Sequence, residues 1–351
     1  MWCKGLIALV LSGVCFVSQA GVITAPQGVR PCCAFGTDLG VAFAGLSMPF
    51  VNIKNTLDVT DIGEHIYNDG KQGPISSLLG LGEEKNGLIF TKKGGFIDTA
   101  HVRDTADYTY YLYRRVVHNI GKCSKIDLGP ELKLRSIKLN SCGQVLSLAT
   151  RQEKAAKFAA VTAFRLAQWH EIAQWFGLKS VAGFPELASA FSPEDLYSNM
   201  LGAVVALEIL QTVPKIDKEQ FIAAFNHKFK GKLRELGAVS ADETEQKILQ
   251  LDGIWWNSKQ SLPNKWLLLK RDYSMALTLK PNGVEDGVEL SLQSAERWGV
   301  LKLTDLDDSK HQHFKMLPIE LRSMGYWTVE HFEQLADFAK QADQMELQLM
   351  Q

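Results

Sequence analysis

The stretch RQEKAAKFAAVTAFRLAQWHEIAQWF, residues 151–176, organises this sequence. It carries alanines at helical spacing, namely Ala156, Ala159, Ala163 and Ala167. The pattern predicts one long helix with a face of small side chains, against which a neighbouring backbone can pack closely. The same face leads to His170, which Glu171 follows. Because an imidazole on a packed face needs a polar partner, His170 is predicted to be either a hydrogen-bonded core histidine or part of a site.

A second informative segment, GGFIDTAHVRDTADYT, spans residues 94–109. Asp98 or Thr99 can cap a helix whose packed face begins at Val102. His101 lies at the border of that face, in the first helical turn. Helix ends and the loops before them often carry functional residues, so His101 is predicted to belong to a site rather than to the core.

The rest of the chain mixes helical and strand-like segments. Residues 88–91 form a strand candidate, and residues 132–139 are expected to pair with 145–148 as a hairpin. Residues 21–85 are expected to form an irregular wrap. Further helix starts carry capping residues, which are Ser192, Asp217, Ser240 and Thr328. The sequence therefore predicts an α+β fold that is predominantly helical, with small antiparallel strands and hairpins.

The first twenty residues have the features of a secretory signal. Lys4 precedes an apolar run over residues 6–17, and Ser18-Gln19-Ala20 supplies a small-residue cleavage site. The apolar run is too short for a permanent membrane anchor. Cleavage after Ala20 predicts an exported protein, periplasmic or secreted. The alternative is a lipid anchor at Cys15, although Val14 stands where a small residue is expected.

The mature chain, residues 21–351, is expected to form a single domain, with a softer C-terminal subdomain from about residue 252. It contains no later segment apolar enough for a transmembrane helix. The formal net charge of −1 argues against a nucleic-acid partner.

Four cysteines remain beyond the signal: Cys32, Cys33, Cys123 and Cys142. In an oxidising compartment they indicate disulfides rather than a zinc ribbon, because no pair has the two-residue ligand spacing. Adjacent Cys32 and Cys33 can hardly bridge each other, so each is expected to reach Cys123 or Cys142 and to staple the N-terminal wrap. A reactive thiol is the alternative.

The residues with the clearest chemical potential are His101 with Asp98 or Asp104, joined in space by His170 and Glu171. One interpretation is a divalent-metal site, for example for zinc, with Asp98, His101, Asp104 and His170 as ligands and a position left for water. The zincin motif is absent, since Gln174 stands where its second histidine would be.

The same groups allow a metal-free site and a purely structural role. His101 or His170 can act as a general base that a carboxylate such as Glu171 orients. Alternatively, His170 bonds a backbone carbonyl and Asp98 only caps its helix. Glu194, Asp195 and Asn199 lie at the next helix start, where acids are expected for structural reasons.

Other sequence motifs are weak or absent. His311 and His313 form a His-x-His pair in a polar stretch, for which a solvated loop is the simpler interpretation and a metal site the alternative. No Gly-x-Ser-x-Gly elbow, phosphate loop or dinucleotide fingerprint is present. The commonest hydrolase, kinase and oxidoreductase signatures are therefore missing.

Several unusual segments occur together in this chain: RPCCAFG (30–36), GGFIDTAHVR (94–103), WHEI (169–172) with WFG (175–177), and FSPEDLYSN (191–199). In this combination the mature chain resembles, over nearly its whole length, an uncharacterised bacterial family of exported proteins that carries only the label domain of unknown function 4056. The resemblance implies a Gram-negative envelope or secreted setting. It implies no activity, substrate or cofactor, and members are often lipoproteins.

Two hypotheses follow for the function. The first is an envelope hydrolase, metal-assisted or not, that uses His101, His170 and Glu171 on a cell-envelope or extracellular small molecule or polymer. The second is a non-catalytic envelope protein that binds a glycan, a lipid or a protein partner, in which these residues only hold helices together.

Overall fold

The computed structural model describes residues 23–30, 34–43, 46–53, 55–70, 84–140, 142–179, 186–305 and 313–350. The predicted signal, Cys32, Cys33 and His311 lie outside the described residues.

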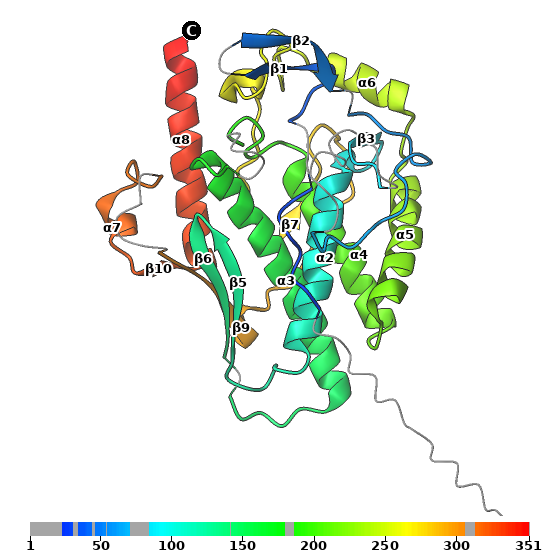
Figure 1. Ribbon diagram of the computed structural model, residues 1–351, viewed down its shortest axis with the longest axis vertical. Helices are drawn as coiled ribbons and strands as arrows, with labels where there is room; N and C mark the ends of the chain where they lie inside the picture. The colour runs from blue at the N-terminus through cyan, green and yellow to red at the C-terminus, as the bar shows by residue number, and fades with distance from the viewer. Residues whose placement is uncertain are drawn as a thin grey trace, which may run out of the picture.

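Three helices in mutual contact form the centre of the molecule: α2 (Thr99–Val116), α3 (Leu148–Trp175) and α4 (Asp195–Thr212). They run side by side in Figure 1. Gly202 permits the closest approach, because a Cβ at this position would lie only 2.1 Å from the carbonyl oxygen of Val102 on α2. The alanine face of α3 is buried as predicted, with Ala156, Ala159 and Ala163 almost inaccessible to solvent.

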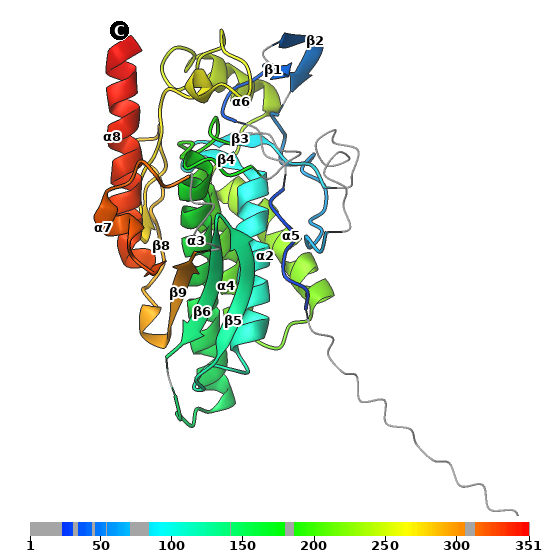
Figure 2. The same ribbon diagram turned by 60° about the vertical axis from the view of Figure 1, so that its left-hand side comes forward.

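A four-stranded antiparallel sheet lies along one side of these helices (Figure 2). Its order is β10 (Tyr326–Trp327), β9 (Gly299–Thr304), β6 (Lys133–Leu139) and β5 (Lys125–Glu131). A Cβ at Gly299 would lie 2.9 Å from the Phe158 ring of α3, so the sheet packs directly on that helix. Helix α8 (Phe332–Met350) contacts α3 as well.

The other elements surround this centre. The helices are α5 (Lys218–Glu235), α6 (Ala241–Leu249) and α7 (Ile319–Arg322). The strands pair as β1 (Leu39–Phe43) with β2 (Leu46–Ile53), β3 (Leu88–Thr91) with β4 (Gly95–Asp98), and β7 (Thr278–Leu279) with β8 (Leu290–Ser291). Short 3-10 turns are η1 (Lys265–Leu267), η2 (Glu296–Trp298) and η3 (Val329–His331).

The structure confirms the predicted α+β class and several individual elements. Strand β3 has the predicted bounds, and Asp98 caps α2 by accepting from the backbone of Ala100 and His101. The capping box at Asp217 is formed with Gln220. Among the described residues, no helix is long and apolar enough to cross a membrane.

The predicted hairpin partner was wrong. Residues 133–139 form β6 as expected, but their hairpin partner is β5, which precedes them, and not residues 145–148. The turn lies at Leu132, whose backbone is left-handed with φ 52°. A left-handed non-glycine residue at the turn is uncommon, so the sequence gives little sign of it. On its other edge β6 pairs with β9.

The expected disulfide pairing was also wrong. Cys123 and Cys142 bond each other, with their Cα atoms 4.7 Å apart. They flank the β5–β6 hairpin, whose antiparallel pairing brings its two ends together. The disulfide therefore closes this hairpin and does not tie Cys123 or Cys142 to the N-terminal wrap.

Helix α4 starts later than predicted. Its first residue is Asp195, and its N-cap Glu194 makes no side-chain capping bond. The hydroxyl of Ser192 donates to Glu194 Oε2 at 2.7 Å and so does not cap the helix. Glu194 and Asp195 at this helix start are both buried. A role as exposed acids that only stabilise the helix start does not explain this burial.

Candidate functional site

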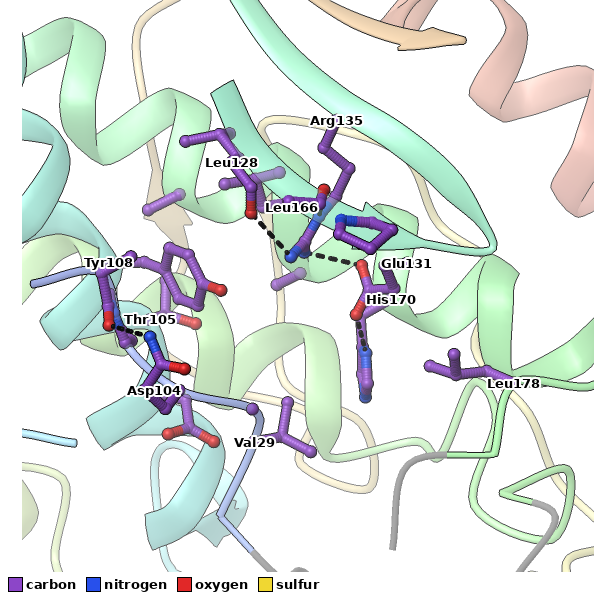
Figure 3. A pocket seen from close by; sticks show the side chains of 18 of the residues that line it. Val29, Asp104, Thr105, Tyr108, Leu128, Glu131, Arg135, Leu166, His170 and Leu178 are labelled. Atoms are coloured by element: carbon purple, nitrogen blue, oxygen red, sulfur yellow. Dashed lines mark hydrogen bonds and ion pairs between the residues drawn. The ribbon is translucent and has the colours of Figure 1, made fainter. Parts of the chain in front are cut away.

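A cavity of about 570 Å³ opens between the three central helices, the β5–β6 hairpin and the extended segment 25–29. Figure 3 shows Thr105 and Tyr108 on α2 on one side, and Glu131, Arg135 and His170 on the other. His101, Asp104 and Asn199 also line it.

Three side chains converge next to this cavity: His101, which lines it, and the buried Asp98 and Asp195. Each offers one ligand atom, and these atoms all lie within 4.8 Å of one another. The Nε2 atom of His101 is 3.2 Å from Oδ1 of Asp195. One imidazole and two carboxylates in this arrangement can hold a divalent metal ion, since zinc takes nitrogen and oxygen ligands at about 2 Å each.

The junction of three elements sets this geometry. Asp98 is the last residue of β4 and the N-cap of α2, so His101 follows in the first turn. Asp195 is the first residue of α4. The backbone N–H of Asp98 donates to Ser198 Oγ at 2.9 Å, which fixes the start of α4 against the start of α2.

Two further carboxylates are buried beside the three converging residues. Glu171 and Glu194 both interact electrostatically with Asp195, and all three side chains are at most 3% exposed. Among the described residues, Glu171 Oε1 and Glu194 Oε1 have no hydrogen-bond partner, and Asp195 Oδ1 makes no hydrogen bond besides its 3.2 Å ion-pair contact with His101 Nε2. Buried carboxyl oxygens without hydrogen-bond partners are costly in a folded protein and are stabilised by a cation or a proton.

The electrostatics of these carboxylates follow from their burial. Burial, followed by the charges of Glu194, Glu171 and Asp98, raises the pKa of Asp195 well above its ordinary value. Burial likewise raises the pKa of Glu194 to about 8 and raises that of Glu171. The neighbouring residues therefore do not provide enough positive charge to keep Glu171, Glu194 and Asp195 all ionised.

Glu171 is held in place by an unusual backbone conformation. Phe191 has a left-handed backbone with φ 59°, and its N–H donates to Glu171 Oε2 at 2.6 Å. A left-handed phenylalanine is strained, and such strain often occurs at functional sites. The bond occupies Oε2 and leaves Oε1 as the unpartnered oxygen.

His170 lines the same cavity but has partners of its own. Its Nδ1 is 2.8 Å from Glu131 Oε1, and Arg135 Nη1 is 2.8 Å from the other oxygen of Glu131. Burial alone would lower the pKa of His170, but Glu131 and then Glu186 raise it to about 9. His170 thus links α3 to the β5–β6 hairpin (Figure 3).

The second nitrogen of His170 meets the side chain of Gln174. Gln174 Nε2 lies 3.0 Å from His170 Nε2, whereas Gln174 Oε1 is buried without a partner. As placed, the amide donates to a neutral imidazole. A protonated His170 requires the amide to turn so that Oε1 accepts from His170 Nε2, which is sterically possible because the two amide orientations have nearly the same shape. The turned amide gives up the bond that Gln174 Nε2 donates to Glu186 Oε2 at 3.2 Å.

Asp104 anchors the N-terminal segment. Its Oδ2 accepts from the backbone N–H of Arg30 at 2.7 Å, and its Oδ1 is 2.5 Å from Arg30 Nη1. The same guanidinium contacts Glu84 at 2.6 Å. Asp104 therefore holds in place the segment that forms one wall of the cavity.

Of the four residues predicted to bind a metal, the structure thus brings Asp98 and His101 together. Asp104 and His170 line the same cavity but contact Arg30 and Glu131. Sequence reasoning gave Asp195 no place among the ligands, because an acid at a helix start has an adequate structural explanation. Its burial, which no sequence pattern reveals, distinguishes it. His313 lies apart, 3.0 Å from the carbonyl oxygen of Phe176.

Comparison with known proteins identifies a family. A family model described as "Protein of unknown function (DUF4056)" matches residues 20–285. No curated protein and no solved structure matches the chain.

Proposed function

Since this chain belongs to the DUF4056 family of proteins of unknown function, we propose a function from its site: a metal-assisted hydrolase in which Asp98, His101 and Asp195 hold the metal. The observation that carries this proposal is the convergence of these three side chains, of which His101 lines the cavity, next to buried carboxyl oxygens without hydrogen-bond partners. A divalent cation would neutralise these charges, which burial otherwise makes unfavourable.

Asp98, His101 and Asp195 would hold the metal, and a metal with three protein ligands would supply a bound water with a pKa near neutrality. In hydrolysis the water oxygen would bond to the carbonyl carbon of the substrate, and the bond from that carbon to the leaving group would break. Glu171 would accept a proton of the water through its unpartnered Oε1 and pass it to the leaving group. The products are a carboxylic acid and an alcohol or amine.

His101 is a metal ligand in this proposal, whereas His170 shapes the cavity by holding the β5–β6 hairpin through Glu131. The signal predicted for residues 1–20 supports a reaction outside the cytoplasm as part of this proposal. The substrate would then be a molecule of the cell envelope or of the extracellular medium.

The test is zinc binding by protein purified without a histidine tag, measured by elemental analysis and by calorimetric titration of the metal-free protein. We expect about one zinc ion per chain for the wild type and a large loss of affinity for His101→Ala, because one of three ligands is removed. His227→Ala is the matched control, since His227 is an exposed histidine on α5. Equal zinc binding by His101→Ala and the wild type would refute the assignment. A folded wild type that takes up no divalent metal would favour a non-catalytic role.

A further inference from the structure

Asn199 lines the same cavity, and the nitrogen of its side-chain amide makes no hydrogen bond to the described residues. It is 2% exposed and follows Asp195 by one turn of α4, so both side chains lie on the same face. Its Oδ1 accepts from the hydroxyl of Thr105 at 2.7 Å. Among the described residues, its Nδ2 has no hydrogen-bond partner.

The contact with Thr105 gives the amide a defined direction. Thr105 is on α2, one turn after His101, and also lines the cavity. Because its hydroxyl donates to Oδ1, the two N–H groups of Asn199 are directed away from Thr105. A buried amide nitrogen without an acceptor costs free energy, which a ligand oxygen would recover.

Part of the cavity wall is apolar, whereas Glu131, Arg135 and His170 make another part polar. Ala163, Leu166 and Ala167 come from α3, Leu128 from the β5–β6 hairpin, and Val29 from the N-terminal segment. A ligand that fills the cavity would place an apolar group on these side chains and an oxygen atom near Asn199. This arrangement suits an acyl group, which has a carbonyl oxygen at one end and a hydrocarbon body.

We propose that Asn199 donates an N–H to the carbonyl oxygen of the substrate, and that the substrate is an ester or amide with an apolar acyl group. This inference rests on the proposed function, because the metal must lie beside that oxygen. During attack by water the carbonyl oxygen gains negative charge, and a fixed N–H donor then binds it more strongly than in the ground state. Thr105 is a positioning residue that fixes the amide.

The experiment uses zinc-loaded full-length protein and two probes, acetohydroxamate and octanohydroxamate, whose binding is followed by calorimetry. Each probe presents a carbonyl oxygen to a metal and its neighbours, and only the second has a long apolar chain. We expect octanohydroxamate to bind the wild type more tightly. Asn199→Ala should weaken both probes by about tenfold to a hundredfold, as expected for a lost hydrogen bond to a charged oxygen.

Two further variants separate this role from a structural one. Asn199→Asp keeps the shape and the acceptor for Thr105 but replaces the N–H donors by an oxygen, so it should weaken both probes at least as much as Asn199→Ala. It also serves if Asn199→Ala does not fold. Thr105→Val should weaken the probes less, because the amide remains present but loses its fixed direction.

Zinc affinity, measured in parallel, distinguishes the outcomes. The inference is supported when the Asn199 variants bind zinc like the wild type and lose probe affinity. Unchanged probe affinity with normal zinc binding overturns the role of Asn199 and leaves the hydrolase proposal standing. A loss of zinc affinity in Asn199→Ala also overturns it, because Asn199 would then be a metal ligand. Failure of the wild type to bind zinc removes the proposed function, and this inference with it.

Discussion

At the scale of single residues, the two histidines of interest have different surroundings. His101 faces the carboxylate of Asp195 beside orphaned oxygens, whereas His170 has a polar partner at each ring nitrogen. A ligand needs a free nitrogen lone pair, and a residue that holds two elements together needs occupied nitrogens. His101 is therefore suited to bind a ligand, whereas His170 holds two structural elements together.

The charge of His170 predicts a pH dependence of stability. Its pKa is raised to about 9, from an ordinary value of 6.5. A histidine whose pKa is higher in the folded protein stabilises the fold fully below pH 6.5, and this contribution disappears as the pH rises through 9. Between pH 6 and pH 10, the free energy of unfolding of the wild type should fall by about 3 kcal/mol more than that of His170→Gln.

Urea denaturation at the two pH values measures this difference, and the exposed His227→Gln is the control. The two proteins should differ most at pH 6 and converge at pH 10. A constant difference at both pH values would mean that His170 is neutral throughout and accepts from Gln174 as placed.

At the scale of secondary-structure elements, the sequence predicts those helices and strands that have a periodic pattern of apolar residues or a capping residue. The long helix with its alanine face, strand 88–91 and the Asp98 cap could all be recognised, because local spacing and capping chemistry produce them. The hairpin turn at Leu132 could not be recognised, because a left-handed backbone at a leucine is uncommon and has no local sequence signal. The partner of Cys123 follows from that hairpin and was missed with it.

The contact between α2 and α4 yields a prediction for Gly202. A Cβ here would lie 2.1 Å from the carbonyl oxygen of Val102, so Gly202→Ala must push the two helices apart. We expect the free energy of unfolding to fall by about 1–3 kcal/mol, which is the usual effect of overpacking. Because Asp195 and His101 lie on these helices, zinc affinity should fall as well.

Gly231→Ala is the matched control for this change. Gly231 lies within α5, and a Cβ there would meet no atom within 4 Å. Alanine should therefore leave zinc binding unchanged and stabilise the protein by up to about 1 kcal/mol through its higher helix propensity. Thermal melts and zinc titration of both variants provide the comparison. A Gly202→Ala protein with wild-type stability would show that the helices do not depend on this close approach.

At the scale of the whole molecule, the candidate site joins segments that are far apart in sequence. Asp98 and Asp195 are separated by almost a hundred residues, and the cavity also includes residues 25–29 and the hairpin. Sequence spacing could relate Asp98 to His101, which are neighbours on one helical turn. It could not bring in Asp195 or Asn199, since their position beside the residues of α2 depends on how α4 packs against α2.

The N-terminal segment belongs to this architecture through Arg30, which is 6% exposed. Its guanidinium lies 2.6 Å from Glu84, 2.5 Å from Asp104 and 3.0 Å from Asp107. Substitution of Arg30 by methionine would leave buried carboxylates without their principal cation, and removal of one partner from a buried ion pair costs about 3–5 kcal/mol. We expect Arg30→Met to destabilise the protein by at least that amount at pH 7.

The matched control is Lys157→Met, because Lys157 pairs with Glu153 at 2.8 Å on the exposed side of α3. An exposed pair of this kind contributes about 0–1 kcal/mol, so a charge lost there should have little effect. Chemical denaturation of the two variants gives the free energies. Limited proteolysis, read by the N-terminal sequence of the products, should also show early cleavage near residues 23–30 in Arg30→Met only. Similar stability losses in both variants would mean that Arg30 acts as an ordinary surface charge. A large loss confined to Arg30→Met would establish that the wall of the cavity is held by this buried ion cluster.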